Sequence, residues 1–330
     1  MIDKQIITGG GQRVRLPWID WAKSICMFCV VLTHTGCFGR EIVLNYFDMP
    51  AFLMISGYLY KRVPFKEEIR KSFRGIVVPY LILNSIILVV SLFFYSFHWS
   101  DVLNLLLGNQ EGLRWNCFFP MWFLVSIFII RIICSFFNEK TYLWLMLVMV
   151  AVGYWVWSFA PYDYDYFQIC TTAMCLPFFL FGTVLKRYDG FILLNKIKPI
   201  LRYALICILL VLLYYLLRYN GFANIFRCVT GKNPLLYYLA GISFSYLVLY
   251  LISKVFTKSW AVVLTISSGT VLILGLHRIF IEGFIFSLPR NSYIAITTAF
   301  LVMLICYPLI LFAQKYFPAM VGGRGVKNKK

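Results

Sequence analysis

Residues 18–36 read WIDWAKSICMFCVVLTHTG, and this stretch decides the class of fold. Its length is close to the about 20 residues that an α-helix needs to cross the hydrocarbon core of a bilayer. Asp20, Lys23 and His34 nevertheless lie inside it. Ionisable side chains within a membrane span are costly, so they usually face a polar cavity and serve a function. The stretch is therefore both a membrane span and the first candidate for a functional site.

The composition agrees with a membrane protein. Hydrophobic residues make up 61% of the 330 residues, charged residues only 13%, and the mean hydropathy is +0.80. This balance excludes an ordinary soluble domain and is typical of a polytopic helical membrane protein. We predict an all-α fold with about ten transmembrane helices, each long enough to span a bilayer. The predicted spans are 18–36, 42–59, 75–97, 117–136, 141–159, 168–185, 199–218, 234–253, 260–278 and 292–313.

The basic residues predict the orientation. Of the 31 Lys and Arg residues, 22 fall on the side that holds both chain ends and only 7 on the opposite side. Because cytoplasmic loops carry the excess of Lys and Arg, both termini are predicted to be cytoplasmic. We expect a multi-pass protein of the cell (plasma or inner) membrane, without a cleavable signal peptide. It would comprise a cytoplasmic arm (1–17), an integral-membrane domain (18–313) and a basic cytoplasmic tail (314–330).

This orientation also explains the net charge of +18. In a soluble protein such a charge would suggest a nucleic-acid partner, but here the basic loops lie beside anionic membrane lipids, and we expect no nucleic acid. Segment 60–74, YKRVPFKEEIRKSFR, is the most basic of these loops. Arg70 and Arg74 share one helix face within it. The segment is either a topology signal or a site for a phosphorylated cytosolic donor, since Arg favours phosphate.

Cysteine and histidine residues suggest neither a disulfide framework nor a metal site. Most of the ten cysteines fall inside spans, where Cys packs as a small apolar residue. Cys37, Cys117 and Cys228 lie near the outer face, where a bridge between two of them stays open. The three histidines show no ligand spacing, so we expect no metal.

Depth in the membrane groups several polar residues. Lys23 and His34 are eleven residues apart, about three turns and ~16 Å of rise, on nearly the same helix face. His34 and His277 are both predicted near the outer side, on spans that are remote in sequence. A lone histidine in a helix is usually structural, whereas two at one depth indicate a functional site.

Local motifs then resemble one family. The first is Arg15 followed by WID at 18–20, with ten residues between Lys23 and His34. The others are FDMPAFLMISGYLYKR (47–62), RGIVVPY (74–80), MWFLVSIFI (121–129), PFFLFGTVLKR (177–187) and LGLHRIF (274–280). In this order they resemble integral-membrane acyltransferase family 3, and most closely its stand-alone sugar O-acetyltransferases of the fucose O-acetylase type. Two departures are Lys23 in place of the commoner Arg, and no appended extracytoplasmic hydrolase-like domain. We therefore expect the membrane part to act alone or with a partner.

The resemblance implies transfer of an acetyl group from cytosolic acetyl-CoA, as donor substrate rather than bound cofactor, to a hydroxyl of a cell-surface or lipid-linked glycan. A sugar hydroxyl does not ionise at neutral pH, so a general base is needed. His34 is the candidate base, and an acetyl-imidazole relay through it is the second possibility. Lys23 would hold the phosphates or the thioester of the donor, and Asp20 would keep Lys23 charged.

The remaining candidates divide between the two substrates. His277 is a further catalytic candidate, Arg70, Arg74 and Ser56 join Lys23 on the donor side, and Asp48, Trp122 and Glu282 would bind the acceptor. A homo-oligomer or partners in polysaccharide assembly are compatible with this function. The rival interpretation is a transporter or flippase of a lipid-linked saccharide, because intramembrane charges also mark translocation paths. Nothing in the sequence argues for a membrane sensor or scaffold.

Overall fold

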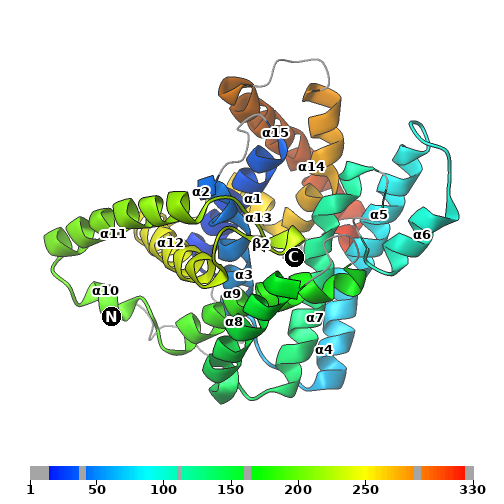
Figure 1. The fold of residues 1–330 in the computed structure, drawn as a ribbon. Coiled ribbons are helices and arrows are strands. Elements are labelled where there is room, and N and C mark those ends of the chain that lie inside the picture. The colour runs from blue at the N-terminus through cyan, green and yellow to red at the C-terminus, as the bar shows by residue number, and fades with distance from the viewer. Residues whose placement is uncertain are drawn as a thin grey trace, which may run out of the picture.

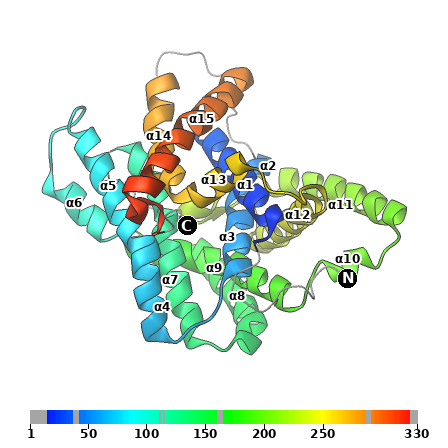
Figure 2. The ribbon, with the colours of Figure 1, turned by 180° about the vertical axis from the view of Figure 1, so that it is seen from behind.

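The computed structural model describes residues 15–36, 42–109, 113, 115–159, 165–285 and 291–323. These residues are almost entirely helical, which confirms the all-α fold (Figures 1 and 2). The α-helices of the first half are α1 (Pro17–His34), α2 (Ile42–Asn45), α3 (Asp48–Leu59), α4 (Phe65–Ser72), α5 (Val78–Ser91), α6 (Trp99–Leu106), α7 (Trp122–Phe136) and α8 (Tyr142–Phe159). Those of the second half are α9 (Ile169–Arg187), α10 (Ile192–Asn195), α11 (Pro199–Asn220), α12 (Pro234–Val255), α13 (Ala261–Ser268), α14 (Thr270–Ile285) and α15 (Ser292–Tyr316).

Short elements join these helices. A π-helical turn, η1 (Phe73–Val77), connects α4 to α5, and the 3₁₀ turns are η2 (Asn116–Met121), η3 (Glu139–Thr141), η4 (Tyr166–Gln168), η5 (Ile225–Arg227) and η6 (Pro318–Val321). Strands β1 (Ala223–Asn224) and β2 (Val229–Thr230) pair antiparallel, with Ala223 opposite Thr230 and Asn224 opposite Val229.

Six helices of the described chain are long and apolar enough to cross a membrane. They are Phe65–Ser91, Glu139–Phe159, Tyr166–Arg187, Pro199–Asn220, Pro234–Val255 and Ser292–Tyr316, and the bent pair α13–α14 would make a seventh. The chain is thus a multi-pass membrane protein. Helix α3 has 12 residues and α7 has 15, which is fewer than the about 20 residues that a bilayer-spanning helix needs. The count of ten spans and the cytoplasmic termini stay predictions.

The basic segment 60–74 is not the loop that the sequence suggested. It becomes helical at Phe65, and this helix continues without a break to Ser91. The third predicted span, 75–97, therefore ends six residues earlier than expected. The reason is an inward face on α4: Glu68 is fully buried and accepts hydrogen bonds from Ser72 Oγ (2.6 Å) and from Arg131 Nε of α7 (2.6 Å). A buried charge needs such a partner, so this ion pair fixes α4 on α7.

The predicted ninth span, 260–278, is also wrong as a single straight helix. It breaks at Gly269, and α13 and α14 meet at a bend of 82°. A Cβ atom at Gly269 would lie 2.4 Å from the side chain of Ile310, so glycine lets α15 approach the bend closely. The bend directs α14 toward the end of α1, as the next subsection describes.

Helix α1 lies at the centre of the molecule, between α3 and the α13–α15 group (Figures 1 and 2). Its neighbour α3 packs most extensively on α9. Two glycines allow this contact, because a Cβ at Gly57 would meet the Phe179 carbonyl oxygen at 1.9 Å and one at Gly182 would meet that of Met54 at 2.0 Å. Small residues at helix interfaces let backbones come close in membrane proteins. The pair α3–α9 is therefore a tightly fitted unit.

The last described residues pack back on the membrane domain. Helix α15 runs past the expected boundary at residue 313, and Gln314 donates to Ser268 Oγ at 2.7 Å. Val321 of η6 is only 2% exposed. The described part of the tail is thus part of the folded body.

Candidate active site

His34 is the last residue of α1. Its Nδ1 lies 2.7 Å from the carbonyl oxygen of Val30, one turn earlier. A carbonyl only accepts, so Nδ1 carries the hydrogen and the neutral ring keeps its lone pair on Nε2. That Nε2 has no hydrogen-bond partner among the described residues, and His34 is half-buried. His34 therefore keeps one ring nitrogen that no described protein group occupies.

His277 lies beside it on α14. The two rings are 4.9 Å apart between centroids, at 63°, so the structure brings together two histidines that the sequence analysis placed at one depth. Nδ1 of His277 donates to the carbonyl oxygens of Ile273 (2.9 Å) and Leu274 (3.0 Å), so it has the same tautomer as His34. His277 is fully buried, and its Nε2 has no partner within the described residues. Of the two histidines, only His34 is partly exposed.

Arg278 is a residue of this site that the sequence analysis did not select. One of its terminal nitrogens donates to the backbone carbonyl of His34 at 3.0 Å, and the other lies 3.4 Å from a carboxylate oxygen of Glu282. The guanidinium thus donates a hydrogen bond to one of the backbone carbonyls at the C-terminal end of α1, which lack partners within the helix. Its position next to His277 in LGLHRIF is the signal in the sequence that points to it.

Asp48 begins α3 and is 4% exposed. Its carboxylate accepts hydrogen bonds from the Met49 amide (2.6 Å) and from Thr33 Oγ1 (3.4 Å). Thr33 directly precedes His34, so Asp48 lies at the same end of α1 as the histidines. Its buried carboxylate holds the end of α3 against the end of α1.

A small apolar cavity of about 30 Å³ lies one helical turn from the histidines. Val30 and Leu274 separate it from the two rings. The remaining lining residues are Met27, Met49, Phe52, Phe123, Leu124, Thr270 and Val271. A cavity that holds one water needs roughly 10–15 Å³, so this one has room for a group of a few heavy atoms.

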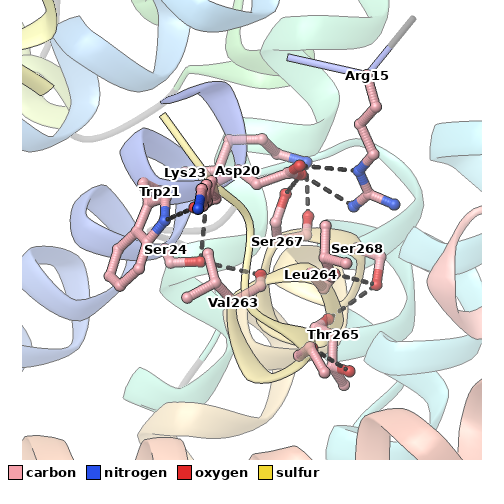
Figure 3. A network of polar contacts seen from close by, with 12 residues as sticks. Arg15, Asp20, Trp21, Lys23, Ser24, Val263, Leu264, Thr265, Ser267 and Ser268 are labelled. Atoms are coloured by element: carbon pink, nitrogen blue, oxygen red, sulfur yellow. Dashed lines mark hydrogen bonds and ion pairs between the residues drawn. The ribbon is translucent and has the colours of Figure 1, made fainter. Parts of the chain in front are cut away.

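Lys23 and Asp20 form a separate polar network where α1 meets α13 (Figure 3). Arg15 donates to both oxygens of Asp20, at 2.8 and 2.9 Å, and Ser267 Oγ donates to one of them at 2.7 Å. Lys23 Nζ donates to the Ser267 carbonyl at 2.6 Å, where a cation suits the C-terminal end of α13. These contacts dock α13 on α1. The predicted role of Asp20 in keeping Lys23 charged stays a prediction.

The other donor-side candidates lie apart from this network. Arg70 on α4 and Arg74 on η1 are exposed, and their side chains make no hydrogen bond or ion pair within the described chain. Helix α4 packs on α7, whereas Lys23 packs on α13. Ser56 is half-buried near the end of α3. The structure thus shows no contact that joins Arg70 or Arg74 to Lys23 among the described residues.

On the predicted acceptor side, Trp122 is only 6% exposed and stacks on Phe226 of η5, with centroids 5.6 Å apart. Glu282 is partly exposed and pairs with Arg278. Cys117 and Cys228 are both free thiols, so they do not form the bridge that was left open between them. Cys37 lies outside the described residues.

Comparison with known proteins agrees with these observations. A family model described as an acyltransferase domain matches residues 16–313, which includes α1, the bend at Gly269 and the histidine pair. No curated protein and no solved structure matches the chain. A match over this share of the sequence identifies the family, and the chain therefore belongs to acyltransferase family 3.

Proposed function

We propose that the protein is a membrane O-acetyltransferase that moves an acetyl group from cytosolic acetyl-CoA to a hydroxyl of a cell-surface or lipid-linked glycan in the plasma (inner) membrane. Membership of the family supplies the acyl transfer. The observation that carries the rest is the half-buried ring of His34, which the Val30 carbonyl holds through Nδ1 so that Nε2 keeps its lone pair. A fixed, neutral imidazole is the side chain best suited to take a proton from a sugar hydroxyl near neutral pH.

In the direct mechanism, Nε2 of His34 accepts the hydroxyl proton while the sugar oxygen attacks the thioester carbon. The bond between that carbon and sulfur then breaks, and the departing CoA sulfur takes the proton from the imidazolium. The hydrogen bond from Nδ1 to Val30 keeps the ring in the required tautomer and orientation throughout.

In the relay mechanism, Nε2 itself attacks the thioester carbon and the carbon–sulfur bond breaks, which leaves CoA as the thiolate and an acetyl-imidazolium on His34. The acceptor hydroxyl then attacks this intermediate, the bond between the acetyl carbon and Nε2 breaks to restore the free ring, and the hydroxyl proton is released to solvent, where it balances the thiolate. The buried Nε2 of His277 cannot take either role without movement, because protein encloses it. His34 is therefore the residue that acts on substrate in both schemes.

One neighbouring feature supports charge stabilisation. Arg278 places a partly buried cation beside the His34 carbonyl, and a fixed cation there would favour negative charge that develops on the thioester oxygen.

The transport alternative has less support, because Asp20 and Lys23 dock α13 on α1 and need no translocation path to account for them. A direct test is to incubate the purified protein with labelled acetyl-CoA and a membrane lipid extract of the producing cells, without any ion gradient. The proposed enzyme releases CoA and labels the extract. Absence of both products under these conditions would favour the transporter.

A further inference from the structure

A second pocket lies at the end of the molecule where α3 and α9 finish and α8 begins. It has a volume of about 430 Å³ and lies outside the histidine site. Its lining residues are Tyr60, Lys61, Glu139, Tyr142, Thr183, Val184, Lys186 and Arg187. This volume falls within the range of about 300–1,000 Å³ that is usual for small-molecule sites.

The charges in this pocket are unbalanced. Lys61, Lys186 and Arg187 supply three cations against the single carboxylate of Glu139. Lys61 and Arg187 are exposed, and neither makes a hydrogen bond or an ion pair with a described residue. The Arg187 guanidinium lies over the ring of Tyr188, with its Cζ atom 5.6 Å from the ring centroid. Lys61 and Arg187 therefore carry positive charge that no described residue neutralises.

The walls of the pocket are pre-formed. Tyr60 donates to the Arg131 carbonyl at 3.4 Å, and Tyr142 donates to the Cys134 carbonyl at 2.8 Å. Both tyrosines are at least nine-tenths buried, so their rings form a fixed floor. Because the floor is already ordered, a ligand that binds here loses little free energy to ordering the protein.

A simpler explanation covers part of this pattern. Lys186 and Arg187 occupy the last turn of α9, where cations complement the helix dipole. It does not explain why Lys61, from a different segment, faces the same hollow. It also does not explain a concave shape, since cations that only fix topology need no pocket.

We propose that this pocket binds a phosphate-bearing ligand. Arg and Lys bind phosphate through charge-assisted hydrogen bonds, and basic pockets at the ends of membrane helices hold phosphate head groups. Two sources share this chemistry: the head group of an anionic phospholipid and the phosphates of a soluble nucleotide such as CoA. The inference does not depend on acetyl transfer, because binding can be measured without turnover.

Helix α3 connects this pocket to the histidine site. Gly57 and Gly182 lock α3 against α9, and the opposite end of α3 begins at Asp48, which contacts the residue before His34. A ligand that binds this pocket binds the folded protein and not the unfolded chain. It should therefore stabilise the folded protein by mass action.

The experiment compares the thermal unfolding of three purified full-length proteins. They are the parent, the double variant Lys61→Ala/Arg187→Ala, and the matched control Lys196→Ala/Lys198→Ala, which removes two exposed cations outside the pocket. Each is titrated with CoA in neutral detergent and, separately, with phosphatidylglycerol in phosphatidylcholine nanodiscs. All four substituted side chains are exposed, so the variants should fold.

We expect the parent and the control to be stabilised by one of the two ligands. The pocket variant should need about tenfold or more of that ligand for the same shift, as expected when a charge-assisted contact worth roughly 1.5–3 kcal/mol is lost. Weakened phosphatidylglycerol binding identifies a lipid site, and weakened CoA binding identifies a nucleotide site. A pocket variant that responds to both ligands like the control, or a parent stabilised by neither, overturns the proposal.

Discussion

Replacement of Gly182 by alanine should destabilise the protein through the contact between α3 and α9. The added Cβ would lie 2.0 Å from the Met54 carbonyl oxygen, whereas ordinary contacts begin at 3.4 Å, so the helices must separate locally by about 1.4 Å. The clash is with backbone, which cannot rotate away as a side chain can. Overpacking of this kind costs about 1–3 kcal/mol or more, against a gain of about 1 kcal/mol from alanine in a helix.

Gly283 provides the matched control. It lies on α14, is exposed, and a Cβ added there meets no atom within 4 Å. Gly283→Ala should therefore be neutral or stabilise the protein by up to about 1 kcal/mol, because only helix propensity changes. The assay is thermal unfolding in one detergent, with size-exclusion chromatography to confirm monodisperse protein. Equal melting temperatures for Gly182→Ala and Gly283→Ala would refute the reasoning about α3 and α9.

Three further predictions concern charged residues. Arg278→Lys should fold but lower kcat about tenfold or more, with a smaller change in KM. The reason is that Lys cannot contact the His34 carbonyl and Glu282 together, and an unchanged kcat would contradict this. Glu68→Ala should destabilise the protein by about 3–5 kcal/mol in thermal or denaturant unfolding, because it removes the carboxylate partner of the partly buried Arg131. A loss of stability under about 1 kcal/mol would argue against a structural ion pair. Arg74→Ala should raise the acetyl-CoA concentration for half-maximal rate more than it lowers the maximal rate, as expected for a donor contact; unchanged donor binding would leave the basic segment with only a topological role.

The sequence predicted the class of fold well because hydrophobic length is a local property. The position of most helices follows from runs of apolar residues, and these runs need no knowledge of packing. The bend at Gly269 could not be predicted in the same way. The run Ser267-Ser268-Gly269-Thr270 hints at a break, but the bend of 82° and the close approach of Ile310 to Gly269 depend on tertiary packing.

The buried ion pair of α4 shows a second limit. Glu68 and Arg131 lie far apart in sequence, and nothing local to either residue indicates its partner. Segment 60–74 therefore looked like a polar loop, although its acidic and hydroxyl residues Glu68 and Ser72 share one helix face. The tertiary contact between Glu68 and Arg131 explains why α4 packs as a helix on α7.

The candidate site was partly predictable for a related reason. His34 and His277 were matched by their expected depth in the membrane, and the structure brings their rings into contact. Arg278 was missed because depth alone does not tell which side chain reaches the end of another helix. Lys23 illustrates the converse, since an intramembrane charge that suggested function makes a structural contact with Ser267.

The central claim is that Nε2 of His34 performs the acyl transfer. The most direct measurement is the rate of acceptor-dependent CoA release by purified His34→Ala, with the parent and Lys198→Ala, a distant exposed variant, measured in parallel at saturating acetyl-CoA. Loss of a positioned general base removes about 10²–10⁴-fold of rate, so His34→Ala should retain about 1% or less of the parental rate while Lys198→Ala stays near it. A correctly folded His34→Ala protein that works within about tenfold of the parent would contradict the account.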